Sequence, residues 1–112
     1  MNYRSKSKKH CEELYEAILT LQTVEECEAF FQDLCSVNEL QAMEQRYQVA
    51  SYLDRGYIYN DILAETGASS ATISRVNRSL RFGKGGYETA FRRLENHVRE
   101  ASEADEKKVE IF

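Results

Sequence analysis

The segment from Ser69 to Tyr87 carries four basic side chains and no acidic one. The basic residues recur every third position, as Arg75, Arg78, Arg81 and Lys84. Guanidinium and ammonium groups bind phosphate oxygens, and arginine also forms paired hydrogen bonds with guanine. The whole chain has a net charge of −4, so a basic patch says more about a binding partner than the total does. The segment therefore indicates nucleic-acid binding, although charge alone fits a solvated helix face equally well.

Small and hydroxyl-bearing side chains precede these basic residues. At the start of a helix they permit close approach to the floor of a major groove, where they can meet base edges and thymine methyl groups. The helix N-terminus itself favours a phosphate. We therefore expect base contacts from Ser70, Ala71, Thr72, Ser74 and Arg75. We expect phosphate contacts mainly from Arg78, Arg81 and Lys84.

The element that must position these side chains is a helix-turn-helix over residues 59–81. Gly67 falls where the tight turn needs a residue without a Cβ atom, and Ser69 suits the N-cap of the second helix. The positions that such a motif buries hold Ile62, Thr66, Ala68, Ile73 and Val76. An ordinary buried helical hairpin has a similar pattern, but the acid-free face favours the DNA-binding motif.

The rest of the 112-residue chain indicates an all-α protein, because it contains no proline and only 5 glycines. Capping boxes begin at Thr23 and Ser36. The spacing of apolar residues predicts about six helices, near residues 10–22, 24–34, 36–55, 59–66, 70–81 and 87–101. The predicted inner face of the third helix holds Leu40, Met43, Tyr47, Ala50 and Leu53. We expect one domain over 1–112, with a basic arm at 1–9 and a frayed tail at 102–112.

The composition argues against several classes of function. No apolar run approaches the ~18 residues of a membrane span, and the N-terminus lacks a signal-peptide core, so we expect a cytoplasmic protein. Histidine occurs only at His10 and His97, so we expect neither a catalytic site nor a cofactor. His10–Cys11 has no second ligand pair at metal spacing, so no metal site is expected. We expect reduced, mostly buried thiols at Cys11, Cys27 and Cys35.

Charge is strongly segregated along the chain. Residues 11–35 contain seven acidic residues and no basic one, so we expect them to lie away from DNA phosphates. The arm from Arg4 to Lys9 could enter a minor groove or remain a solvated tail. The acidic helices also permit another function, in which the helix-turn-helix protein docks on a basic protein partner and not on DNA.

The sequence resembles the tryptophan-repressor superfamily from about Leu34 to Tyr87. The stretch from Ala71 to Leu80 is similar to its repressor-like branch named YerC/YecD. This resemblance implies an intertwined homodimer with two helix-turn-helix heads, acting as a bacterial, sequence-specific transcriptional regulator on double-stranded DNA. Two such heads enter successive major grooves ~34 Å apart, so the site should be near-palindromic.

The resemblance also implies where an effector pocket would lie. In the tryptophan repressor the corepressor ring lies between two arginines, at the positions of Arg46 and Arg75 here. The repressor has glycine after the second arginine, whereas this chain has Val76, whose side chain fills part of that pocket. Ile58 replaces the usual Ser or Thr cap. The resemblance therefore supports DNA binding more strongly than it supports tryptophan as the corepressor. Whether another small molecule binds stays open.

Overall fold

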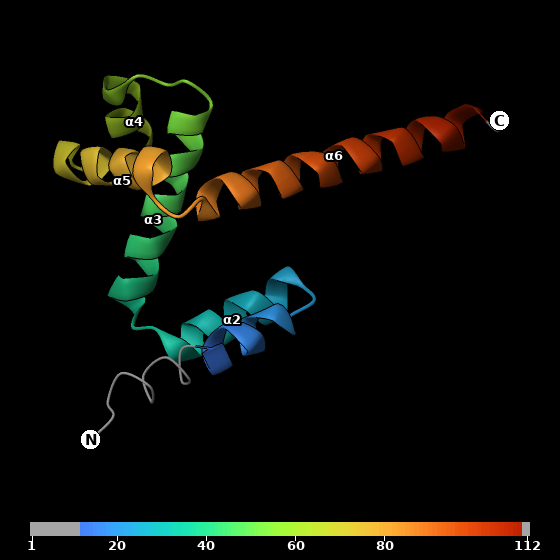
Figure 1. Cartoon of the computed structure of the whole chain (residues 1–112), viewed down its shortest axis with the longest axis horizontal. Coiled ribbons are helices and arrows are strands. Elements are labelled where there is room, and N and C mark those ends of the chain that lie inside the picture. The colour runs from blue at the N-terminus through green and yellow to red at the C-terminus, as the bar shows by residue number, and fades with distance from the viewer. Residues whose placement is uncertain (1–11, 111–112) are drawn as a thin grey trace. The chain divides into compact units, whose positions relative to one another are not determined.

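A computed structural model describes residues 12–110, and this part of the chain is helical with no strand. Residues 12–19 form the first helix. The helices that follow are α2 (Val24–Leu34), α3 (Val37–Asp54), α4 (Tyr59–Thr66), α5 (Ser70–Phe82) and α6 (Gly86–Glu110) (Figure 1). The all-α prediction and its helices are thus confirmed. The predicted basic arm, with His10 and Cys11, lies outside the described residues.

The chain divides into two compact units, Met1–Ala42 and Met43–Phe112. In the first unit, the predicted capping box at Ser36 is complete, whereas the one at Thr23 is confirmed only in part, because the Glu26 carboxylate binds the N–H of the residue before the N-cap. The Thr23 hydroxyl accepts from the Glu26 backbone N–H at 3.1 Å, and the Glu26 carboxylate accepts from the Gln22 N–H at 2.8 Å. At the start of α3, the Ser36 N–H donates to the Glu39 carboxylate at 2.8 Å, and the Glu39 N–H donates to the Ser36 hydroxyl at 3.2 Å. These bonds fix both helix starts.

The apolar side chains of the first unit are incompletely covered. No residue of α2 is buried, and Leu34 is exposed. Phe30 and Phe31 make an edge-to-face contact with ring centroids 5.6 Å apart. Cys27 and Cys35 are partly buried, so the predicted burial of these two thiols is confirmed only in part. The physical reason is that two short helices and the start of α3 provide too little surface to enclose them.

The hydrophobic core lies in the second unit, between α4, α5 and the C-terminal half of α3. Its buried members are Val49, Ala50, Leu53, Ile62, Ala68, Ile73 and Val76. Partly buried side chains packed against them are Tyr52, Leu63, Leu80, Tyr87 and Phe91. Figure 1 shows α4 and α5 beside this half of α3. The helix-turn-helix is therefore anchored on the long helix.

The predicted inner face of α3 is only partly correct. Ala50 and Leu53 are buried, whereas Met43 and Tyr47 are both 42% exposed. Val49, which the pattern did not select, is fully buried. Helical periodicity predicts which side of a helix is apolar, but a side chain is buried only where another helix packs on that side. Only the later turns of α3 pack against α4 and α5.

Helix α6 is longer than predicted. It ends at Glu110 and not at Ala101, so the structure has helix where a frayed end was expected. Residues 102–110 are rich in Glu and Lys, which are good helix formers. At the other end of α6, Tyr87 and Phe91 pack against the core, and the Phe91 ring lies 5.6 Å from that of Tyr47.

Candidate nucleic-acid interface

The turn between α4 and α5 has the geometry that the sequence predicted. Gly67 ends α4 in the left-handed region, with φ 69° and ψ 6°, and its N–H donates to the Leu63 carbonyl at 3.0 Å. Residues with a Cβ atom adopt this conformation only at a free-energy cost. Glycine therefore allows the chain to reverse direction and start α5 at the correct angle.

Thr66 stabilises this turn through its hydroxyl. The hydroxyl donates to the Ile62 carbonyl at 2.7 Å and accepts from the Ala68 N–H at 3.2 Å. The Gln45 side-chain amide also donates to the Thr66 carbonyl at 3.2 Å. The predicted burial of Thr66 is only partial, because a hydroxyl with two partners replaces an apolar contact. Gln45 was not predicted, since no local pattern indicates a bond across 21 residues.

The N-terminus of α5 is capped by Ser69, as predicted. The Ser69 hydroxyl accepts from the Thr72 N–H at 3.1 Å and donates to the Thr72 hydroxyl at 3.0 Å. Thr72 is half-buried, whereas Ser70 and Ala71 are exposed beside it. The small residues that begin α5 are therefore accessible, with Thr72 at their edge and held by the cap.

The two faces of α5 differ sharply in character. Ile73 and Val76 are buried in the core. Exposed side chains from the candidate set are Ser70, Ala71, Ser74, Arg75, Arg78 and Arg81. The Arg81 guanidinium donates to the Asn77 side-chain oxygen at 3.0 Å, which orients it along the helix. Because both ends of α5 are fixed by the core, this face presents a rigid row of small and basic side chains.

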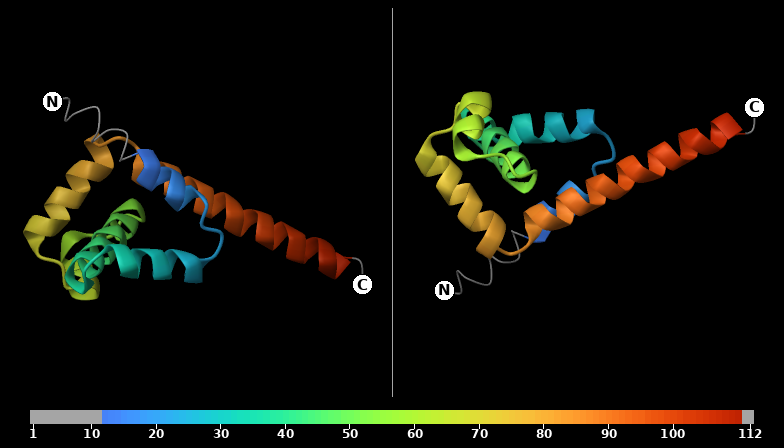
Figure 2. Two further views of the ribbon diagram at one scale, coloured as in Figure 1. Left: turned by 90° about the horizontal axis from the view of Figure 1, so that it is seen from below. Right: turned by 90° about the horizontal axis from the view of Figure 1, so that it is seen from above.

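The candidate basic residues do not all lie on the helix. Lys84 lies in the turn between α5 and α6, which Figure 2 shows as a short connection. Gly83 is the C-cap of α5, and its N–H donates to the Ser79 carbonyl at 2.9 Å. A Cβ atom at Gly83 would collide with that carbonyl oxygen, so this close approach requires glycine. Lys84 is thus exposed immediately beyond the helix end.

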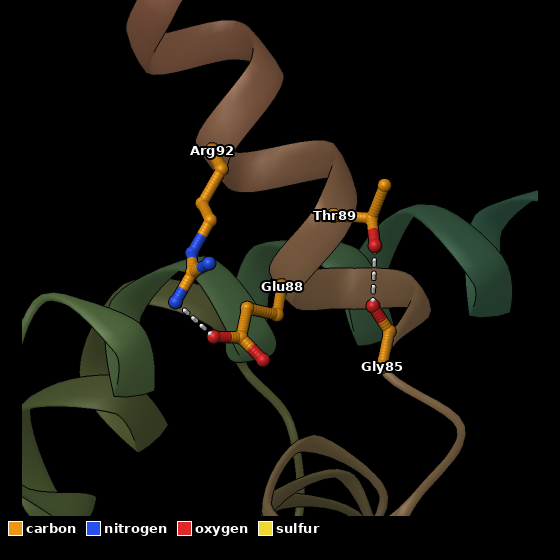
Figure 3. A network of polar contacts seen from close by, with 4 residues as sticks. All are labelled: Gly85, Glu88, Thr89 and Arg92. Atoms are coloured by element: carbon orange, nitrogen blue, oxygen red, sulfur yellow. Dashed lines mark hydrogen bonds and ion pairs between the residues drawn. The ribbon is translucent and has the colours of Figure 1, made fainter.

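The basic segment ends where α6 begins. Glu88 is the first acidic residue after it, and it pairs with Arg92 at 2.6 Å (Figure 3). In the same turn the Thr89 hydroxyl donates to the Gly85 carbonyl at 2.9 Å. The Glu88 charge is therefore partly offset within α6, so its repulsion of a phosphate near Lys84 is reduced.

One exposed side chain on this segment was not predicted as a site residue. Phe82, the last residue of α5, is 84% exposed. Its sequence signal was its spacing of four residues after Arg78, which places the two on the same side of a helix. The sequence interpretation treated it only as part of the break that ends the helix.

The three residues of the predicted effector pocket differ in burial. Arg46 on α3 and Arg75 on α5 are exposed. Val76 is only 3% exposed and belongs to the hydrophobic core. Ile58 occupies the N-cap of α4 and makes no side-chain capping bond, which is the departure that the sequence indicated.

Among the residues whose side chains the structure describes, no group of His, Cys, Asp or Glu could hold a metal ion. Within the described helices, none combines the length and apolar character needed to cross a bilayer.

Comparison with known proteins gives a consistent result. Residues 9–95 match the family described as Trp repressor protein. The chain is 47% identical over 94 residues to the uncharacterized protein YerC of Bacillus subtilis (strain 168), a match that covers 84% of this chain and 90% of that protein. A TrpR-like protein from Eubacterium eligens ATCC 27750 has a similar crystal structure, with 47% identity, a TM-score of 0.75 and coverage of 78% of this chain and 90% of that one. A protein from Staphylococcus aureus named for the Trp repressor has 47% identity and a TM-score of 0.76, covering 85% and 95%.

Proposed function

The chain belongs to the Trp repressor protein family, and from this premise we propose that it is a sequence-specific transcriptional regulator that binds double-stranded DNA as a homodimer. Proteins of this family are regulatory DNA-binding proteins and not enzymes, in agreement with the sequence-based prediction. The proposed target is a near-palindromic site, and the proposed compartment is the cytoplasm.

The observation that carries this proposal is the exposed face of α5. Ser70, Ala71 and Ser74 are exposed in its first two turns, followed by Arg75 and Arg78. Small side chains at the start of a recognition helix permit contact with base edges, and the arginines that follow reach guanine or phosphate. The buried residues on the opposite face hold this row in place against α3 and α4.

Exposed apolar side chains support the homodimer. On α6, Leu94 is 50% exposed and Val98 is 67% exposed, although they continue the stripe that begins with Phe91. In the first unit Leu34 is exposed as well. Apolar stripes at helical spacing are usually covered by another surface, and a second copy of the chain provides one in a symmetric dimer. Two recognition helices ~34 Å apart would then enter successive major grooves.

Val76 supports DNA binding without tryptophan as corepressor. Its side chain is almost completely buried and belongs to the hydrophobic core of the second unit. An indole ring could bind at this place only if the volume that the Val76 side chain fills were empty. We therefore propose that the protein binds its site without tryptophan, and that Arg75 contacts DNA.

The test is selection of genomic fragments by the purified full chain, without ligand, at low salt and at ~200 mM salt. The expected result is enrichment of one near-palindromic sequence that persists at the higher salt, because base contacts release few counterions. The control is a double variant, Arg75→Ala with Arg78→Ala, which should enrich nothing.

Two other outcomes lead to different conclusions. If the wild-type protein enriches no sequence, selection is repeated with a panel of amino acids, and enrichment with one of them would identify an effector. If it enriches none in either case, the regulator proposal is wrong. The helix-turn-helix surface then serves the alternative role of docking on a protein partner.

A further inference from the structure

Phe82 is an exposed aromatic residue at the C-terminal end of the recognition helix. Its side chain is 84% exposed. Among the large apolar side chains that the structure describes, only that of Leu19, in the first unit, is equally exposed. The residues that follow include Gly83, Gly85 and Gly86, which have no side chains to cover the ring. The single chain therefore leaves an aromatic surface open at this place.

The position of Phe82 around α5 is informative. With 100° per residue, Ala71, Arg75, Arg78 and Phe82 lie within one narrow stripe, opposite the buried Ile73. The stripe is the face on which the proposed base and phosphate contacts lie. Phe82 thus continues the proposed DNA-binding face by one more turn.

The position along the helix identifies which part of DNA is within reach. Phe82 lies eleven residues after Ala71, which corresponds to about 16 Å along the axis. A major groove is only about 12 Å wide. When Ala71 and its neighbours meet the base edges, the end of α5 therefore reaches the sugar–phosphate wall of the groove. Deoxyribose carbons there offer an apolar surface between the charged phosphates.

The surrounding charge favours DNA over a second copy of the chain. Arg78, Arg81 and Lys84 are exposed on the same segment as Phe82, and no acidic residue occurs from Ser69 to Tyr87. A symmetric contact between two copies through Phe82 would bring these like charges together, which is destabilising. DNA instead brings phosphates that pair with these basic side chains, while its sugars cover the Phe82 ring.

We propose that Phe82 is a DNA-contacting residue whose ring packs against deoxyribose carbons, next to the phosphates bound by Arg78 and Arg81. This inference depends on the proposed DNA-binding function. The contact is apolar and touches no base edge, so it adds affinity for every sequence. Because the ring displaces no counterion, its contribution is independent of salt concentration.

The experiment compares wild-type protein with the variants Phe82→Ala, Phe82→Leu and Arg78→Ala. The probes are two duplexes of roughly 30 base pairs, one with the selected site and one of mixed sequence. Phe82→Ala should weaken binding to both duplexes by about tenfold, because the apolar contact is lost. Phe82→Leu should lose less, and neither should change the slope of log affinity against log salt. Arg78→Ala should reduce that slope.

Other results overturn the inference in distinguishable ways. Unchanged affinity of Phe82→Ala, with wild-type binding intact, means that the ring does not touch DNA. Weaker self-association of Phe82→Ala in sedimentation equilibrium assigns the ring to a contact between copies. Failure of wild-type protein to bind either duplex rejects the proposed function itself. Circular dichroism checks folding, and Phe82→Leu preserves the test should Phe82→Ala misfold.

Discussion

Gln45 and Thr66 join the long helix to the helix-turn-helix, since the Gln45 side-chain amide donates a hydrogen bond to the Thr66 carbonyl at 3.2 Å. Thr66 is also the residue whose hydroxyl links Ile62 to Ala68 across the end of α4. The angle at which α5 leaves the core therefore depends on side-chain hydrogen bonds as well as on apolar packing.

Replacement of Gln45 by alanine tests this relationship. Loss of a partly buried hydrogen bond should lower the free energy of unfolding by about 0.5–1.5 kcal/mol. Gln48→Ala is the matched control, because Gln48 is an exposed glutamine on the same helix and should change stability by less than about 0.5 kcal/mol. Urea unfolding at one fixed protein concentration measures both. Equal effects of the two substitutions would contradict a role for the Gln45 bond.

Arg78→Ala tests phosphate binding by the recognition helix. We expect weaker binding to all sequences and a salt slope reduced by about one unit for each lost contact per subunit. Arg99→Ala is the control, since Arg99 is an exposed arginine of α6 outside the basic segment. Fluorescence anisotropy from low to moderate salt gives both slopes. An Arg78 variant with the wild-type slope would assign this arginine to a role other than phosphate binding.

Enlarging the space at Val76 tests the effector proposal. Wild-type affinity for DNA should not respond to tryptophan or other amino acids, because the Val76 side chain occupies the space. Val76→Gly should lose about 2–3 kcal/mol of stability through lost packing and lower helix propensity. Val76→Ala removes two methyl groups without the low helix propensity of glycine, so it is the better-folded variant for the ligand panel. A wild-type response to tryptophan would disprove corepressor-independent binding.

Leu94→Glu tests the proposed role of α6 in dimer formation. A charge at a leucine that the proposed dimer would cover in each subunit should weaken self-association by a factor on the order of a hundred. Asn96→Glu introduces the same side chain at an exposed position on the other side of α6 and should leave association unchanged. Sedimentation equilibrium distinguishes these cases. Equal dimerisation of the two variants would place the interface elsewhere.

The capping box of α3 predicts a pH dependence. Hydrogen bonds from the Ser36 backbone N–H, and then from its side chain, hold the pKa of Glu39 below its ordinary value of 4.5. A lowered pKa in the folded state means that this contribution to stability is complete above about pH 4.5 and is lost as the pH falls through the lowered pKa.

Glu39→Gln separates this effect from other acid-induced changes. Glutamine can accept the Ser36 bond at any pH, so the variant should lose less helicity than wild-type protein between pH 5 and pH 3, where carboxylates titrate. Glu44→Gln, at an exposed position of the same helix, controls for the removal of a charge. NMR titration of the Glu39 carboxyl carbon in wild-type protein measures the pKa directly. A midpoint at or above the ordinary value would contradict the capping role.

Local features of the fold followed from the sequence because they depend on neighbouring residues. The caps at Thr23, Ser36 and Ser69 and the left-handed turn at Gly67 each rest on bonds that span at most four residues. The buried stripe of α5 also follows from helical spacing alone, because any amphipathic helix in a small protein packs its apolar side inward. The candidate DNA-binding face was predictable as the opposite side of that stripe.

Tertiary structure decided which predicted faces are covered and by what. Met43 and Tyr47 share the apolar pattern of Ala50 and Leu53, but only the latter two meet α4 and α5. The bond from Gln45 to Thr66 and the exposure of Phe82 likewise depend on where distant helices pass. Periodicity around a helix depends only on residues a few positions apart, whereas burial depends on segments that only the folded chain brings together.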